Sequence, residues 1–187
     1  MHHRVMSTTT RAGTLAAALN DASALAHPAD MPRYTLADMP SRIGQVLGTS
    51  PWITIDQARI DTFAHTTIDP QWIHVDPVRA AQGPFKTTIA HGFLTLSMMA
   101  WFGERAFAFD GLAHSLNYGM DRVRFPAPVP VGSRLRGVFR LVACEPIENG
   151  QGWQVKVEAT IELEGSAKPA CVAELLTRRY PASTTTP

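Results

Sequence analysis

The sequence predicts a single α+β domain in which an antiparallel β-sheet wraps around one long apolar helix. The segment Ile89–Phe102 is apolar nearly all round, and a helix without a polar face is buried on most sides. In the segment 153–163, apolar and polar residues alternate without an error, which is the pattern of a strand with one buried face. Three further segments after the helix have strand patterns, at 115–125, 133–142 and 170–180. These four strands supply the layer that buries the helix.

Length and composition indicate one ordinary globular domain. A chain of 187 residues is long enough for one hydrophobic core and short for two. The net charge of +1 gives no field that favours nucleic acid or a membrane surface. No run of about 18 apolar residues occurs, so no transmembrane helix is predicted. Cys144 and Cys171 stand in no metal-ligand or redox spacing, and we expect reduced thiols in a cytoplasmic protein.

The chain divides into three parts. We expect residues 1–30 to form a flexible N-terminal arm, with a weak helix at 14–25. The Ala-rich centre of this arm is interrupted by Asn20 and Asp21, so it lacks the continuous apolar core of a signal peptide. The folded domain is expected over 31–180, and residues 181–187 are expected to form a disordered tail.

Shorter elements precede the central helix. The segment 35–50 predicts a short helix that ends near a glycine, and 51–56 predicts a strand. The segment 57–67 has the apolar spacing of one helix face. Asp56, directly before it, is a suitable N-cap residue.

Two Asp-Pro pairs follow within eight residues. Asp76-Pro77 opens a short helix that Gly83 closes, because an Asp cap, a Pro at the first helical position and a final Gly are typical of a helix. Asp69-Pro70 opens the segment 70–75 in the same style. By itself Asp69 would be interpreted as a helix cap, and His74 as a structural histidine.

Two longer segments resemble a known family. These are "TTIDPQWIHVDPVRAAQGPFKTTIAHGFLTLS" (66–97) and "NYGMDRVRFPAPVPVGSRLR" (117–136). Both are similar to the MaoC-like dehydratases, specifically the (R)-specific enoyl-CoA hydratases, and the resemblance extends over about residues 45–178. The fold of that family is the hot-dog fold, one central helix within a curved antiparallel sheet. This is the same plan that the hydrophobic pattern predicts.

The resemblance implies an activity and a site. The expected reaction is the reversible hydration of trans-2-enoyl-CoA to (R)-3-hydroxyacyl-CoA by a homodimer. Coenzyme A is then part of the substrate, and no separate cofactor is expected. The family's catalytic pair falls on Asp69 and His74, and its oxyanion donor falls on the N–H of Gly92. Gln71 stands where the family commonly has Asn, and Ala100 stands where it often has Ser.

The chemistry agrees with this assignment. Addition of water to an enoyl thioester needs a base for the water, an acid for C2 and a stabiliser for the enolate oxygen. A carboxylate and an imidazole can hold one water and divide the proton transfers. If Pro70 begins a helix, His74 lies one turn beyond Asp69 and both side chains can reach one cleft. Which of the two is base and which is acid stays open. Gly92 begins the central helix, where free N–H groups favour developing negative charge.

Other polar residues have simpler interpretations. Arg122 and Arg124 are candidates for contacts to the phosphates of coenzyme A, although most arginines on these strands are expected on solvated faces. His91 is expected to be structural, beside the turn that presents Gly92. No two histidines stand at the i, i+4 spacing and no Cys cluster exists, so no metal site is expected.

Two alternative functions stay open at this point. One is a hot-dog acyl-CoA thioesterase, although that chemistry often uses a carboxylate without the Asp69–His74 pair. The other is a non-catalytic acyl-CoA-binding protein. The changes at Gln71 and Ala100 leave room for this second alternative.

Overall fold

The structure is a computed structural model that describes residues 27–147 and 150–182. Most of the expected N-terminal arm, including the helix expected at 14–25, lies outside the described residues. So do residues 183–187 of the expected tail. Among the described residues, no helix is long and apolar enough to cross a membrane.

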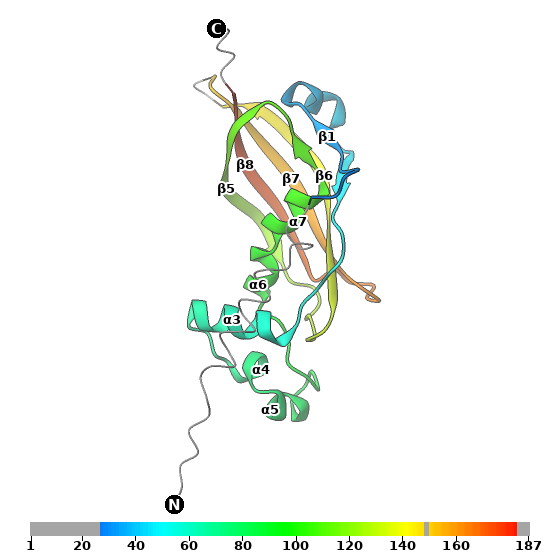
Figure 1. Ribbon diagram of the computed structural model, residues 1–187, viewed down its shortest axis with the longest axis vertical. Helices are drawn as coiled ribbons and strands as arrows, with labels where there is room; N and C mark the ends of the chain where they lie inside the picture. Colours follow the sequence, from blue (N-terminus) through cyan, green and yellow to red (C-terminus); the bar gives the residue numbers. More distant parts are fainter. Residues whose placement is uncertain (1–26, 148–149, 183–187) are drawn as a thin grey trace, which may run out of the picture.

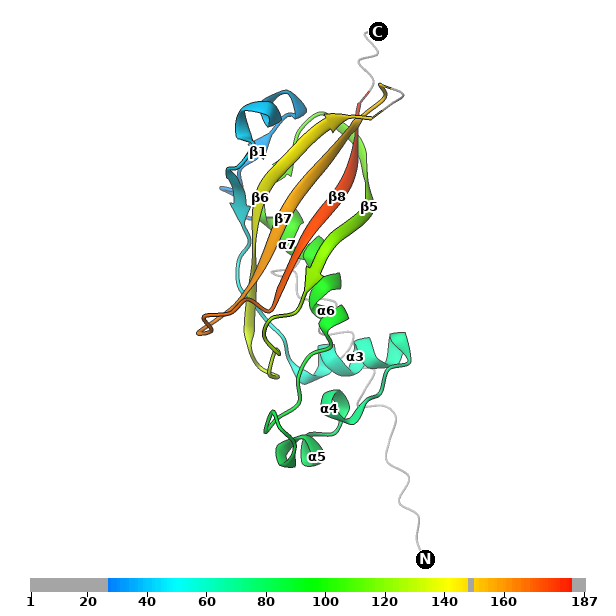
Figure 2. The same cartoon turned by 180° about the vertical axis from the view of Figure 1, so that it is seen from behind.

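A curved antiparallel sheet forms the body of the molecule (Figures 1 and 2). Its strands lie in the order β2–β6–β7–β8–β5, where β2 is Val46–Thr49, and the short strand β3 (Ile53–Thr54) pairs with β6 outside this path. The four strands predicted from alternation are all present: β5 (Leu112–Arg124), β6 (Arg134–Pro146), β7 (Trp153–Leu163) and β8 (Cys171–Pro181).

Strand β7 explains why the alternation was so regular. It lies between β6 and β8, so that Ala159 pairs with Phe139 on one side and Ala173 on the other. Every second residue of β7 from Val155 to Ile161 is buried, while the residues between them are only half-buried. The sheet therefore has one core face, and the central helix packs against it.

The central helix consists of α6 (Gly92–Ser97) and α7 (Met99–Ala106). Met98 between them keeps a right-handed helical conformation, and its N–H donates to the carbonyl of Leu94, so the two parts form one helix. The helix packs directly on β6, where a Cβ at Gly137 would lie 2.7 Å from the Cβ of Phe102. Only a glycine allows this approach. Both views show the helix running along the concave side of the sheet (Figures 1 and 2).

The helix begins later and is less enclosed than its composition predicts. Ile89 is extended and forms a β-bridge with Pro130, so the helix starts only at Gly92. Its buried face includes Met99 and Phe102. The sheet covers one side only, and Phe93 on the opposite side is 69% exposed. Exposed residues continue along that side at Ser97, Ala100 and Glu104.

The remaining helices lie at the two ends of the sheet, and short strands complete the fold (Figure 1). The predicted helix at 35–50 is correct only in its first half, which forms the 3₁₀ helix η1 (Leu36–Arg42). The second half is strand β2 (Val46–Thr49), which pairs with β6. The strand predicted at 51–56 is the short β3 (Ile53–Thr54), and β1 (Arg33–Tyr34) pairs with β4 (Ala108–Phe109). The helices at the other end are α3 (Gln57–Thr67), α4 (Trp72–Val75) and α5 (Pro77–Gln82).

Candidate active site

The end of α3 determines where Asp69 lies. Ile68 has a left-handed backbone conformation with φ 57° and ψ 40°, which is unfavourable for a β-branched residue. The N–H groups of Ile68 and Asp69 both donate to the carbonyl of Ala64. This closes the helix and reverses the chain. The carbonyl of Asp69 then accepts a hydrogen bond from His91, which lies 22 residues further along the chain.

The expectation that Pro70 begins a helix is wrong. Helix α4 begins at Trp72, and its N-cap residue is Gln71, whose side chain makes no capping hydrogen bond. Asp69 therefore lies two residues before the N-cap, and its carboxylate is not used for capping. In contrast, Asp76 caps α5 as predicted, because its carboxylate accepts a hydrogen bond from the N–H of Arg79.

His74 is buried with one ring nitrogen already bound. Its side chain has only 7% exposure, and Nδ1 lies 2.7 Å from the carbonyl oxygen of Ile89. A carbonyl oxygen only accepts, so Nδ1 carries the proton and Nε2 keeps its lone pair. Burial lowers the pKa of His74 from its usual value, and the hydrogen bond to Ile89 acts in the opposite direction. The neutral ring can therefore act as a proton acceptor at Nε2.

Gln57 holds this region together and was not identified from the sequence. Its side-chain amide donates to the carbonyl of His74 at 2.7 Å and to Asp61 at 2.8 Å. Its amide oxygen accepts a hydrogen bond from the buried hydroxyl of Thr88. The start of α3 is thereby fixed to α4 and to the segment before α6. Gln57 follows the cap residue of α3, a position that carries no signal of this role.

The structure brings Asp69 and His74 together. A carboxylate oxygen of Asp69 and one ring nitrogen each of His74 and His91 all lie within 4.8 Å of one another. A gap of this size can be bridged by one water with two hydrogen bonds. The side chain of Asp69 is 56% exposed, so the cluster is open to solvent on the carboxylate side.

The same three residues meet the distance condition for a metal site, which sequence spacing did not reveal. The ring contacts argue against this use. The imidazoles of His74 and His91 are stacked with centroids 3.7 Å apart and planes inclined by 24°. Their nitrogen lone pairs lie in the ring planes, and two stacked planes do not meet at a point close to both rings, whereas zinc ligands converge tetrahedrally on one ion. Each ring also uses one nitrogen for a main-chain carbonyl.

Gly92 lies at the first position of the central helix, as predicted. Main-chain N–H groups in a first helical turn have no partner within the helix. A Cβ at this position would lie 3.2 Å from the ring of Phe125, a residue that is itself 42% exposed. Phe93 packs edge-on against Phe125 with centroids 6.3 Å apart. An aromatic wall thus stands beside the Gly92 main chain.

The two candidate arginines differ in their partners. Arg122 pairs with Glu174 at 3.2 Å, so its charge is already compensated. Arg124 is exposed and donates to the adjacent carbonyl of Val123. No carboxylate partner of Arg124 is found among the described residues. Of the two, Arg124 is thus better placed to bind an anionic group, and it directly precedes Phe125.

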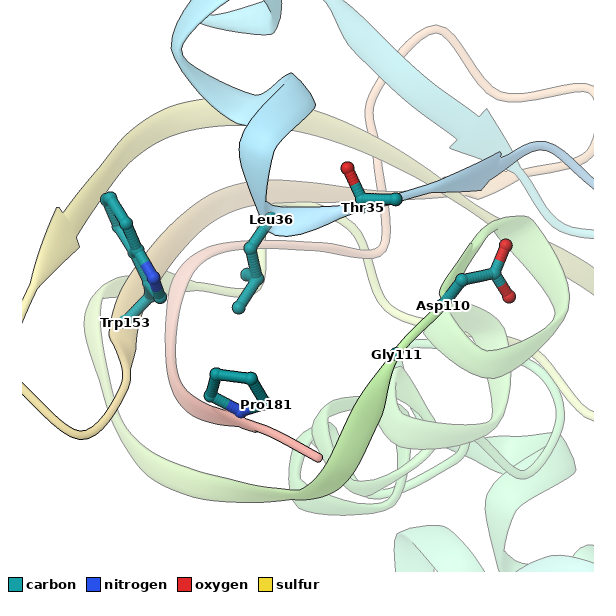
Figure 3. A pocket seen from close by; sticks show the side chains of 6 residues that line it. All are labelled: Thr35, Leu36, Asp110, Gly111, Trp153 and Pro181. Carbon is teal, nitrogen blue, oxygen red and sulfur yellow. The ribbon is translucent and has the colours of Figure 1, made fainter. Parts of the chain in front are cut away.

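A separate pocket lies elsewhere in the molecule, between the η1 end of the domain and the start of β5 (Figure 3). None of the site residues predicted from the sequence lines it. Its lining residues are Thr35, Leu36, Asp110, Gly111, Trp153 and Pro181.

Comparison with known proteins identifies the family. Residues 38–163 match the MaoC-like domain. The chain belongs to the MaoC-like dehydratase family. It is 51% identical over 144 residues to 3-hydroxyacyl-thioester dehydratase Z of Mycobacterium tuberculosis, which covers 77% of this chain and 95% of the relative. The prediction of an enzyme of the hydro-lyase class is confirmed by this similarity.

Two further comparisons give a consistent result. Nodulation protein N of Rhizobium leguminosarum is 48% identical over 154 residues, which covers 79% of this chain and 92% of that protein. Among solved structures, an R-hydratase of Pseudomonas aeruginosa superposes with a TM-score of 0.64 at 20% identity, covering 79% of this chain and 86% of the hydratase. The structural similarity confirms the predicted hot-dog fold.

Proposed function

We propose that the protein catalyses the reversible hydration of trans-2-enoyl-CoA to (R)-3-hydroxyacyl-CoA. The observation that carries this proposal is the convergence of Asp69 and His74, with their side-chain polar atoms within 4.8 Å. The name of the mycobacterial relative specifies a 3-hydroxyacyl-thioester dehydratase, which is the same reaction in the opposite direction. The (R) configuration is supported by the resemblance to hydratases of that stereospecificity.

Asp69 and His74 would share one water molecule. Nε2 of His74 keeps a lone pair because Nδ1 is committed to Ile89, so it can accept a proton from the water. The carboxylate of Asp69 accepts the other hydrogen bond of the water. As the water oxygen bonds to C3, one water proton passes to the pair, and the pair delivers a proton to C2, so that one water is added in all. General acid–base catalysis by such a pair raises the reaction rate by roughly a hundredfold to ten-thousandfold.

The N–H of Gly92 would bind the thioester oxygen. Hydration passes through an enolate-like state in which negative charge develops on that oxygen, and a preorganised N–H donor stabilises it. Because Gly92 has no side chain, the ring of Phe125 packs directly against its main chain, where even a Cβ would lie 3.2 Å from the ring. Gln71 lies at the N-cap of α4 with an exposed side chain. We assign it a substrate contact in place of the family's usual Asn.

We propose coenzyme A as the acyl carrier. Arg124 supports this assignment, since an exposed guanidinium without a carboxylate partner in the described parts of the chain can bind a phosphate. Measuring kcat/KM on matched enoyl-CoA and enoyl-acyl-carrier-protein substrates tests the carrier. A higher kcat/KM on the carrier-protein substrate would contradict our assignment.

The reaction itself can be tested directly. Purified protein mixed with crotonyl-CoA should reduce the absorbance of the conjugated enoyl thioester, and chiral analysis should identify the (R) product. The His74→Ala variant should show no such change. Release of free thiol at an unchanged enoyl signal would indicate the thioesterase instead. Saturable binding of crotonyl-CoA without turnover would indicate a non-catalytic acyl-CoA-binding protein.

We also propose that the protein is a homodimer. Strand β5 pairs with β8 on one side, and its other edge lies at the end of the sheet. Leu116 and Tyr118 on this strand are 52% and 55% exposed. Phe93 and Ala100 add an exposed stripe on the central helix. An open edge and an open helix face are both covered when two copies pair around a twofold axis.

Light scattering on the purified protein checks the dimer. The expected mass is twice the 20.4 kDa of one chain. Leu116→Lys should shift the mass toward one chain, because it places a charge at the paired edge. A wild-type mass of one chain at micromolar concentration would contradict the dimer.

We place the protein in the cytoplasm, where thiols stay reduced. Cys144 and Cys171 are both free. Cys171 is fully buried, and burial raises its pKa to about 11. Such a thiol is structural and unreactive.

A further inference from the structure

His91 contacts both members of the proposed catalytic pair. Its side chain is 3% exposed and lies at the N-cap of α6, directly before Gly92. Its ring stacks on His74 with centroids 3.7 Å apart, and Phe63 packs against it at 5.1 Å. Its Nε2 lies 3.0 Å from the main-chain carbonyl oxygen of Asp69. The sequence alone predicted only a structural histidine here.

The hydrogen bond fixes the tautomer of His91. A carbonyl oxygen accepts, so Nε2 must carry the proton that it shares with Asp69. The carboxylate of Asp69 lies further away, at 3.9 Å from the same nitrogen, beyond hydrogen-bond distance. The bond of His91 therefore holds the main chain of Asp69 and leaves its carboxylate free.

Packing alone does not explain a histidine at position 91. Nδ1 of this ring is buried and has no hydrogen-bond partner among the described residues. A buried polar atom without a partner is unfavourable. A phenylalanine would fill the same space and stack on His74 without this cost. The group that histidine has and phenylalanine lacks is Nε2–H, which donates a hydrogen bond to the main-chain carbonyl of Asp69.

We propose that His91 is a positioning residue for the Asp69–His74 pair, and this inference rests on the proposed hydration reaction. The stack sets the plane of the His74 ring, and with it the direction of the Nε2 lone pair. The hydrogen bond sets the main chain that carries the Asp69 carboxylate. One buried side chain thus fixes the separation across which the water is shared. Displacement of a reacting group by about 1 Å can cost a hundredfold in rate.

Two substitutions separate the contributions of the ring and of the donor. His91→Phe keeps an aromatic ring for the stack and removes the hydrogen-bond donor. His91→Gln removes the ring and places an amide donor near the position of Nε2. His65→Gln is the matched control, since His65 is an exposed histidine on the neighbouring helix α3.

The kinetic result should distinguish positioning from general support of the fold. For His91→Phe we expect kcat to fall about tenfold to a hundredfold while KM changes by less than about threefold. His91→Gln should recover part of this loss, because it restores the donor. His65→Gln should leave both constants unchanged. A His91→Phe variant that keeps the wild-type kcat would overturn the proposal.

A measurement on the folded wild type covers the case in which His91→Phe does not fold. Long-range proton–nitrogen correlation spectra report the tautomer of each ring, and His91 should carry its proton on Nε2. A proton on Nδ1 would overturn the inference. Asp69→Asn is assayed in parallel. If Asp69→Asn is inactive and His91→Phe is fully active, only the role of His91 is refuted. If Asp69→Asn is fully active, the proposed reaction mechanism is refuted, and the positioning role fails with it.

Discussion

Replacement of Asp69 by Asn should remove activity and leave stability unchanged. The amide has nearly the same shape as the carboxylate but cannot exchange a proton with the shared water. Loss of one acid–base partner costs roughly a hundredfold to ten-thousandfold in rate. Each tenfold corresponds to about 1.4 kcal/mol, so the barrier to hydration should rise by roughly 3 to 5 kcal/mol.

The structure limits how far the same substitution affects folding. The main-chain N–H and carbonyl of Asp69 both form hydrogen bonds, and Asn keeps them. The side chain of Asp69 is 56% exposed, and Nε2 of His91 lies 3.9 Å from its carboxylate, beyond hydrogen-bond distance. A solvent-screened carboxylate of this kind contributes at most about 1 kcal/mol to stability. The free energy of unfolding in urea should therefore change by less than about 1 kcal/mol.

Asp76→Asn is the matched control, since it changes the other Asp-Pro pair of the same segment. Asp76 accepts a hydrogen bond from the N–H of Arg79 at 3.0 Å. Asn is about as effective as Asp at an N-cap, so both activity and stability should stay close to wild type. Hydration of crotonyl-CoA and urea unfolding are measured for both variants. Equal activity of Asp69→Asn and Asp76→Asn would refute the catalytic assignment of Asp69.

Four further outcomes follow from the site. Burial lowers the pKa of His74, and protonation removes its Nε2 lone pair. On the acid side, kcat/KM should therefore fall only below a pH of about 6.5. A pH profile of kcat/KM with its acid midpoint above that value would contradict this prediction. Gly92→Ala should lower kcat by at least about tenfold with little loss of stability, since the exposed ring of Phe125 can yield by a few tenths of an ångström. Arg124→Ala should raise KM for enoyl-CoA several-fold, whereas Arg122→Ala, whose cation is paired with Glu174, should not. Dialysis against EDTA should leave turnover unchanged, and a loss restored by zinc would favour a metal site.

Much of the fold could be predicted because its signals are local. A strand with one buried face alternates within the strand itself, and β7 shows this from Val155 to Ile161. The prediction failed where a distant partner decides the structure. Residues Val46–Thr49 are compatible with the end of a helix, but pairing with β6 makes them a strand. Ile89 has the composition of the central helix, but its bridge to Pro130 keeps it extended.

The candidate site could be predicted only in part for the same reason. Asp69 and His74 stand five residues apart and are specified by one motif. The partners that orient them come from elsewhere in the chain. Gln57 reaches His74 across 17 residues, and His91 reaches Asp69 across 22. Such contacts depend on the packing of α3, α4 and the central helix, which no spacing within one segment reveals.

Main-chain carbonyls orient the histidines of the site, so the site geometry depends little on the side chains of the residues that carry these carbonyls. The carbonyl of Ile89 orients the ring of His74, and the N–H of Ile89 donates to the carbonyl of Ile73 at 3.0 Å. The carbonyl of Asp69 orients His91 in the same way. Because a carbonyl is present whatever the side chain, apolar substitutions at Ile73 or Ile89 alter packing but keep these hydrogen bonds. The geometry of the pair therefore depends on the backbone path through 69–74 and 89–92. A proline at position 89 would break that path, because it removes the N–H that joins the two segments.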